Sequence, residues 1–149
     1  GNTISTAEHA FSLMMALSRN IPQANEAIKQ GRWDRKKFMG VELYGKTLGI
    51  IGMGRIGTEF SKRALSFGMR ILAFDPYLTG ERARALNVEP VDLDGLLRES
   101  DFITIHTPLT EETRHLIDEK ALKKAKKGVR IINAARGGIV EEKALAKYL

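Results

Sequence analysis

The chain has 149 residues, 43% of them hydrophobic, which is enough for one globular domain with a buried core. It has no cysteine, which excludes disulfides, thiolate metal sites and cysteine nucleophiles, and no metal site is expected. No apolar run approaches the ~18 residues of a membrane span and no signal peptide is visible, so we expect a cytoplasmic protein without membrane contact.

The formal net charge is +6, and its cations form two clusters, at 32–37 and 120–130. The first carries Arg35 and Lys36 beside Trp33. The second precedes Gly128, and lysines there suit the last turn of a helix with Gly128 as the C′ residue. A solvated helix end is favoured over a nucleic-acid patch, so no nucleic-acid partner is expected.

The chain opens with helical sequence. Ser5 and Glu8 have capping-box spacing and predict a helix over Ser5–Arg19, ended by Pro22. A second helix is predicted over Gln23–Gln30, stopped by Gly31. Apolar residues surround most of the first helix, so it is either a central core helix or one shared between its own domain and a second subunit. We favour the second reading, which makes residues 1–40 a dimer-contact segment.

From Lys46 onward strands and helices alternate, which is typical of an α/β fold with a doubly wound parallel sheet. Residues 41–149 are therefore expected to form one domain, and the ending of the chain inside a helical run predicts that the domain is incomplete at its C-terminus. The predicted strands are Thr47–Ile51, Arg70–Phe74, Val88–Val91, Phe102–His106 and Val129–Asn133. The predicted helices are Arg55–Phe67, Gly80–Leu86, Leu93–Glu99, Glu119–Lys127 and one that starts at Glu141.

A glycine triplet lies between the first predicted strand and its helix. Gly52 permits a tight turn, Gly54 lets the backbone approach a pyrophosphate, and Gly57 lets the helix close on the strand. The N–H groups of Arg55 and Ile56 then face the phosphates, with the helix dipole favouring the anion. This context predicts a Rossmann-type dinucleotide site rather than a turn that happens to be rich in glycine.

Asp75 ends the second predicted strand, 21 residues after Gly54. A carboxylate at this point can accept hydrogen bonds from both hydroxyls of the adenosine ribose, whereas a 2′-phosphate would meet a like charge. No arginine follows, because the next residues are Pro76 and Tyr77. NAD is therefore favoured over NADP, and a turn-forming role for Asp75 before Pro76 is the alternative.

Two further strand ends point to the same crevice, because ligands of open α/β sheets bind outside the carboxyl ends of strands. His106 and Thr107 follow one strand, and the run 133–138 follows another. Arg136 has little to pack against there and can offer a two-pronged donor to a carboxylate. The alternative is an ordinary surface arginine.

Together the motifs GKTLGIIG, GMGRIG, FDPY, HTPLTEETRHLI and NAARGGIVEE resemble the D-isomer-specific 2-hydroxyacid dehydrogenases. Residues 31–40 and 126–130 are most similar to family members that act on a phosphorylated 2-hydroxy acid. The resemblance implies hydride transfer from C2 of 3-phospho-D-glycerate to NAD⁺, the first step of phosphorylated serine biosynthesis.

The resemblance also implies residue roles. Arg136 is the catalytic arginine that grips the substrate carboxylate and carbonyl, and Arg35 and Lys36 meet the substrate phosphate, across a dimer in one reading. Thr113 lines the cofactor path. The complete expected cofactor set is Gly52, Gly54, Arg55, Ile56, Gly57, Asp75, Pro76, Thr107, Pro108, Thr113, Ala134, Ala135 and Arg136.

In this family the acid/base histidine and its glutamate lie downstream of the arginine motif, beyond Leu149. By position none of the histidines His9, His106 and His115 replaces it, and the substrate domain is absent. The chain alone is expected to bind NAD weakly and to be inactive. The parent is expected to be a homodimer or homotetramer, because exposed apolar surface on the first helix would be costly.

Two alternatives stay open. The parent could act on another substrate of the same family, as a glyoxylate or hydroxypyruvate reductase or a formate dehydrogenase. It could also be an NAD-sensing corepressor of the C-terminal-binding protein type, which shares the fold.

Overall fold

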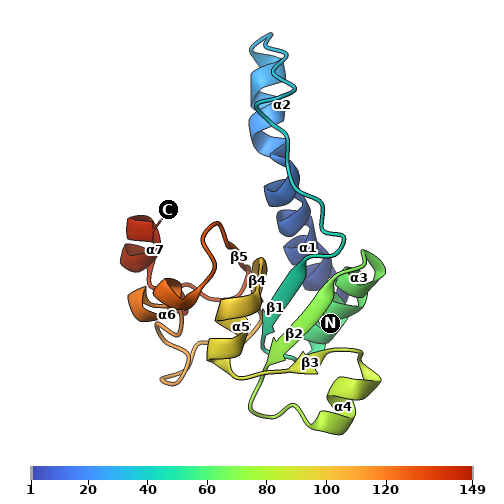
Figure 1. Ribbon diagram of the computed structural model, residues 1–149, viewed down its shortest axis with the longest axis vertical. Coiled ribbons are helices and arrows are strands. Elements are labelled where there is room, and N and C mark those ends of the chain that lie inside the picture. The colour runs from blue at the N-terminus through green and yellow to red at the C-terminus, as the bar shows by residue number, and fades with distance from the viewer. Residues whose placement is uncertain (1, 149) are drawn as a thin grey trace.

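Five parallel strands form the centre of the fold, in the order β3-β2-β1-β4-β5. The structure is a computed structural model and describes residues 2–148. The chain winds outward from β1 to β2 and β3, then crosses back to place β4 on the other side of β1 (Figure 1). This confirms the predicted doubly wound sheet. The strands are β1 Thr47–Ile51, β2 Arg70–Phe74, β3 Glu89–Pro90, β4 Phe102–Ile105 and β5 Arg130–Asn133.

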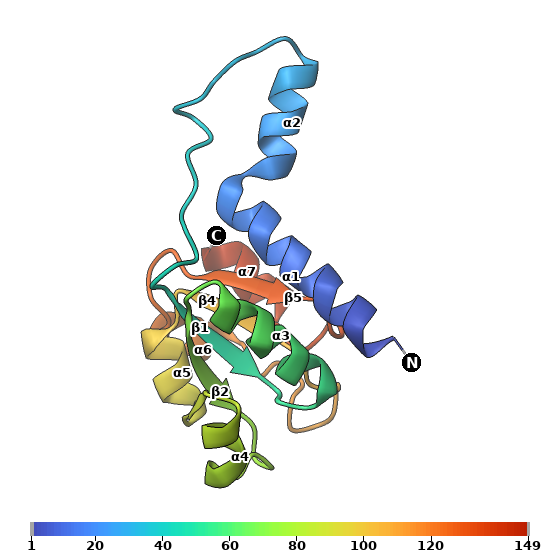
Figure 2. The ribbon, with the colours of Figure 1, turned by 90° about the vertical axis from the view of Figure 1, so that its right-hand side faces the viewer.

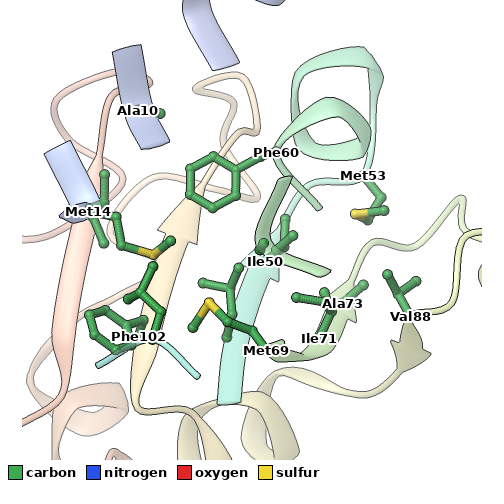
Figure 3. Close-up of a cluster of buried hydrophobic side chains, with 14 of the residues drawn as sticks. Ala10, Met14, Ile50, Met53, Phe60, Met69, Ile71, Ala73, Val88 and Phe102 are labelled. Atoms are coloured by element: carbon green, nitrogen blue, oxygen red, sulfur yellow. The ribbon is translucent and has the colours of Figure 1, made fainter. Parts of the chain in front are cut away.

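Helices cover both faces of the sheet (Figure 2). On one face lie α1 Thr3–Arg19, α3 Arg55–Ser66 and α4 Gly80–Ala85; on the other lie α5 Leu93–Glu99, α6 Glu119–Lys124 and α7 Glu142–Tyr148. Successive side chains of a strand point to opposite faces. Ile50 therefore joins the cluster under α1 and α3, shown in Figure 3, while Ile51 joins the cluster under α5 and α6.

The strands are almost wholly apolar because both of their faces are covered. All four residues of β4 are buried, as are four of the five residues of β1. Gly49 in β1 is part of this packing, since a Cβ there would stand 2.3 Å from Ser100 Oγ and 2.7 Å from the Leu96 side chain. The missing side chain lets α5 lie close to the sheet.

Helix α1 buries one stripe and exposes another. Ala7, Ala10 and Met14 are fully buried against the sheet and α3, whereas Leu13 and Leu17 are 42% and 39% exposed. The predicted all-round apolar helix is therefore only partly covered by its own domain. The ring of Phe11 lies 5.4 Å from that of Phe60 on α3, measured between centroids.

Helix α2, Ile21–Lys29, and the return segment 30–40 project away from the sheet as an arm (Figures 1 and 2). Trp33 and Met39 on the return segment are each 75% exposed. The arm is anchored where Val41 N–H donates to the Ser18 carbonyl at 2.9 Å. Among residues 2–148, no helix combines the length and apolar character needed to cross a bilayer.

Two predicted helix boundaries at the start of the chain are wrong. Helix α1 begins at Thr3 after Asn2, so Ser5 lies within its first turn and caps nothing. The break before α2 is Asn20, which adopts the left-handed conformation at φ 54°, and Pro22 lies in the first turn of α2. Proline is tolerated there because that turn's N–H has no partner in the helix. Gly31, at φ 79°, ends α2 as predicted.

The predicted helix Glu119–Lys127 was too long: α6 ends at Lys124. Gly128, at φ 84°, belongs to a turn in which Val129 N–H donates to the Lys126 carbonyl, so it is not a C′ residue. Three lysines of the second cluster form ion pairs: Lys123 with Glu119, Lys124 with Asp94 and Lys126 with Asp101. The other element ends differ from prediction by one or two residues, because strands and helices fray into their turns.

Candidate cofactor-binding site

The three glycines of the triplet have three different surroundings. Gly52 adopts φ 96°, and a Cβ there would stand 2.7 Å from the carbonyl oxygen of His106. A Cβ on Gly57 would stand 2.1 Å from the carbonyl oxygen of Gly52, while nothing within the described residues comes within 4 Å of a Cβ on Gly54. The turn, the close helix–strand packing and the open approach expected of these positions are all present.

The open side of Gly54 faces the start of α3. Gly54 is the N-cap residue and makes no side-chain cap, so the first N–H groups of the helix, on Arg55 and Ile56, have no partner within it. The positive end of the helix dipole adds to them. Unpaired donors beside an open space fit the pyrophosphate of a dinucleotide.

Asp75 follows β2 and is half-buried. Its Oδ2 accepts the N–H of Met53 at 2.7 Å, and its Oδ1 accepts the N–H of Tyr77 at 2.8 Å. The structure shows the turn-forming role that the sequence left open, because the Asp75 side chain closes the turn around Pro76. An ionised carboxylate has about four acceptor sites, so two bonds still leave capacity for ribose hydroxyls.

The loop after β4 begins with Thr107 and Pro108. Thr113 folds back onto it: its hydroxyl donates to the Pro108 carbonyl at 2.7 Å and accepts the N–H of Thr110 at 2.7 Å. Thr113, which the sequence predicted to line the cofactor path, is seen here as the internal support of this loop.

The loop after β5 is shaped by Asn133, which sequence reasoning did not single out. Its Nδ2 donates to the Arg136 carbonyl at 3.1 Å and its Oδ1 accepts the N–H of Ala135 at 3.1 Å. The signal was available, since asparagine at a strand end before small residues is typical of such side-chain turns. Arg136 is exposed, and Ala134 packs against the core cluster beneath.

Contacts between the loops bring these strand ends together. The N–H of His115 donates to the Gly138 carbonyl at 2.7 Å, and a Cβ on Gly138 would stand 3.7 Å from the Leu109 side chain. The β4 end also touches the glycine turn through His106 and Gly52. The carboxyl ends of β1, β2, β4 and β5 lie at one edge of the parallel sheet, and the glycine triplet, Asp75, Thr107 and Arg136 follow these strand ends.

His106 directly follows β4 and is half-buried. Its Nε2 is 2.8 Å from Thr104 Oγ1, and its ring packs 5.2 Å from that of Phe60. Burial lowers the pKa of His106 to about 4, so the imidazole is neutral at physiological pH. His9 is exposed on α1, and His115, at φ 53°, has its Nδ1 4.0 Å from a Glu141 carboxylate oxygen.

The predicted substrate residues Arg35 and Lys36 do not lie near Arg136 within one chain. Both are exposed on the return segment, which leads into the amino end of β1, whereas Arg136 follows the carboxyl end of β5 (Figure 1). Within one chain these cations and Arg136 are therefore at opposite ends of the sheet.

Residues 11–149 match the family model for the NAD binding domain of D-isomer specific 2-hydroxyacid dehydrogenase. The chain belongs to this family. It is 53% identical over 149 residues to a D-3-phosphoglycerate dehydrogenase of Bacillus subtilis, covering 100% of this chain and 28% of that protein. A D-3-phosphoglycerate dehydrogenase of Archaeoglobus fulgidus is 56% identical over 145 residues, which is 97% of this chain and 28% of the relative. The chain thus spans little more than a quarter of these relatives.

Solved structures of the family share the fold. The apo-structure of D-lactate dehydrogenase from Escherichia coli superposes with a TM-score of 0.93 at 41% identity, over 98% of this chain and 46% of that chain. D-Lactate dehydrogenase from Aquifex aeolicus, complexed with NAD and lactic acid, superposes with a TM-score of 0.89 at 36% identity, over 96% of this chain and 43% of that chain. The chain is an NAD-binding domain of the 2-hydroxyacid dehydrogenase type, as its glycine turn and Asp75 predicted.

Proposed function

We propose that the protein containing this chain oxidises C2 of 3-phospho-D-glycerate with NAD⁺, yielding 3-phosphohydroxypyruvate, NADH and a proton. This is the first step of phosphorylated serine biosynthesis. The proposal rests on a comparison of sequence identities. The two relatives named D-3-phosphoglycerate dehydrogenase are 53% and 56% identical, whereas the D-lactate dehydrogenases from Escherichia coli and Aquifex aeolicus share 41% and 36%.

In this proposal the chain's residues bind and orient. The N–H groups of Arg55 and Ile56 hold the pyrophosphate, and Asp75 holds the adenosine ribose. NAD⁺, when bound, supplies the hydride acceptor. Arg136 grips the substrate carboxylate with its planar guanidinium, directing C2 toward the nicotinamide and polarising the C2 oxygen.

The chain by itself is proposed to bind NAD without turnover. Oxidation at C2 needs a base for the hydroxyl proton, and His106 does not fit that task, because its Nε2 is bonded to Thr104 and its ring packs against Phe60. The base is proposed to belong to another part of the protein. Reduction of NAD⁺ by residues 1–149 alone would contradict this.

The arm is proposed to mediate self-association. Trp33 and Met39 are 75% exposed, Ile28 is 56% exposed, and a hollow of about 150 Å³ lies between α2 and residues 32–38. An apolar surface of this kind is costly in water unless a partner covers it. Since Arg35 and Lys36 do not lie near Arg136 of their own chain, we propose that they reach the substrate phosphate of a second copy.

The deciding experiment is a steady-state assay of the full-length protein. NADH formation is followed with 3-phospho-D-glycerate, D-lactate and glycolate, and the reverse reaction with glyoxylate and hydroxypyruvate. We expect the kcat/KM for 3-phospho-D-glycerate to exceed that of every unphosphorylated substrate by at least about 100-fold. A preference for an unphosphorylated acid would overturn the substrate assignment and leave the NAD-binding assignment intact.

A further inference from the structure

Met53, between the first two glycines of the turn, is held by side chains on both sides of its backbone. Its N–H donates to Asp75 Oδ2 at 2.7 Å. Its carbonyl oxygen accepts from Thr58 Oγ1 at 3.4 Å, and Thr58 Oγ1 accepts from Arg82 Nη2 at 3.0 Å. The end of β2 and α3 therefore bond this residue of the turn directly, and α4 is connected to it through Thr58.

The direction of each bond in this chain is determined by chemistry. A guanidinium can only donate, so Thr58 Oγ1 accepts from Arg82 and its single proton is directed to the Met53 carbonyl. The 3.4 Å bond is long, but the positive charge of Arg82 polarises the hydroxyl and strengthens it. The backbone N–H of Thr58 donates to the Gly54 carbonyl at 3.0 Å. The side-chain hydroxyl of Thr58 donates to the carbonyl of Met53, the residue that precedes Gly54.

The consequence concerns the peptide planes of the turn. A peptide bond is planar and trans, so the N–H of Gly54 points opposite to the Met53 carbonyl. Holding that carbonyl toward Thr58 aims the Gly54 N–H to the other side. The Asp75 bond to Met53 N–H restrains the preceding peptide plane in the same way. The turn thus enters α3 with two consecutive peptide planes restrained before any ligand arrives.

We propose that Thr58 and Arg82 are positioning residues for NAD binding, which hold the Met53–Gly54 peptide so that the N–H donors of the turn face the pyrophosphate. Neither residue needs to touch the cofactor. Asp75 has the matching role on the other side of Met53, in addition to any bond to the ribose. The effect of Thr58 and Arg82 is therefore independent of the ribose hydroxyls.

The test pairs protein variants with two ligands. Dissociation constants of the full-length protein are measured by calorimetry for NAD⁺ and for the analogue that carries 2′,3′-dideoxyadenosine. We expect Thr58→Val to weaken both ligands by the same factor, about 3- to 10-fold, and Arg82→Gln to weaken both by about 2- to 5-fold. Asp75→Ala should weaken the binding of NAD⁺ by a larger factor than the binding of the analogue, and it should still weaken the binding of the analogue.

A second readout needs no ligand. Hydrogen–deuterium exchange of the unliganded protein should be faster for Thr58→Val in peptides covering residues 52–56, by about 3- to 10-fold. Thr58→Ser keeps the hydroxyl and should restore both affinity and exchange. Arg84→Gln is the matched control, since Arg84 is an exposed arginine of the same short helix α4, and it should change neither.

The proposal is overturned if Thr58→Val binds NAD⁺ with wild-type affinity. It is also overturned if Thr58→Val weakens the binding of NAD⁺ but not the binding of the dideoxy analogue. Unchanged exchange at 52–56 in Thr58→Val would also overturn it. A general loss of folding would affect exchange throughout the sheet, so uptake in β4 and β5 separates that case from a local effect on the turn.

Discussion

Gly57 lies so close to Gly52 that a Cβ on Gly57 would stand 2.1 Å from the Gly52 carbonyl oxygen. The obstacle is backbone, which cannot rotate away as a side chain could. We expect Gly57→Ala to lower the free energy of unfolding by about 2–3 kcal/mol, because α3 must move off β1. Urea denaturation followed by circular dichroism measures this change.

Gly54→Ala should behave in the opposite way. Its Cβ meets nothing within 4 Å among the described residues, and its φ of −76° suits an L side chain. We expect stability within about 0.5 kcal/mol of the wild type but an NAD⁺ affinity reduced by about tenfold or more, since the methyl group fills the space left for the pyrophosphate. Unchanged NAD⁺ affinity in Gly54→Ala would mean that the cofactor does not approach this glycine.

Sequence patterns predicted the doubly wound parallel sheet and its glycine turn, because both depend on local rules. The glycine spacing specified the turn, and the apolar runs specified strands buried on both faces. Thr58 and Arg82 could not be predicted, since their contact joins residues 24 positions apart on two different helices. The boundary errors at Ser5, Pro22 and Gly128 arose where several residues could each have formed the cap or break.

The half-buried His106 makes stability depend on pH. Its pKa falls from 6.5 to about 4 on folding because burial disfavours the charged form, so the unfolded chain binds the extra proton. Stability contributed by the neutral ring is therefore complete above pH 6.5 and is lost as the pH falls toward 4. We expect a loss of about 3 kcal/mol at most over this interval, measured by urea denaturation at stepped pH.

His106→Gln should remove this dependence between pH 6.5 and pH 4.5 while its stability at pH 7.5 is lower than that of the wild type. Carboxylates with lowered pKa, such as Glu89 beside Arg70, titrate below this interval and do not confuse it. A variant that still loses stability over the interval would show that another group is responsible.

Asp101 joins the amino ends of three strands. Its Oδ2 accepts the N–H of Thr47 at 2.9 Å, and its Oδ1 accepts from Lys126 Nζ at 3.2 Å. We expect Asp101→Ala to destabilise the fold by about 1–2 kcal/mol, since the Thr47 donor loses its partner, and Lys126→Ala by less than about 0.5 kcal/mol, since that ion pair is exposed. Thermal unfolding of both variants compares them, and equal losses would contradict this ranking.

Catalysis should depend on the planar shape of the Arg136 side chain as well as on its charge. Arg136→Lys in the full-length protein keeps the positive charge but loses the paired donors, and we expect kcat/KM for 3-phospho-D-glycerate to fall by about 100-fold or more. NAD⁺ affinity measured by titration should change less than threefold. Activity near wild type in Arg136→Lys would show that Arg136 does not grip the carboxylate.

The arm can be tested through its exposed apolar residues. We expect the double variant Trp33→Glu and Met39→Glu to sediment as a smaller species than the wild type in analytical ultracentrifugation of the full-length protein. Tyr77→Glu is the control, because Tyr77 is 92% exposed but follows β2, away from the arm. An unchanged sedimentation coefficient in the double variant would place the interface elsewhere.

The rings of Phe67, Phe11, Phe60 and His106 form a row of contacts that runs from the C-terminal end of α3, through α1 and back to α3, to the residue after β4. Each ring leans on the next at 5.0 to 5.4 Å. A continuous row of ring contacts therefore links the surface helix α1 to His106, whose carbonyl oxygen lies beside Gly52 of the glycine turn.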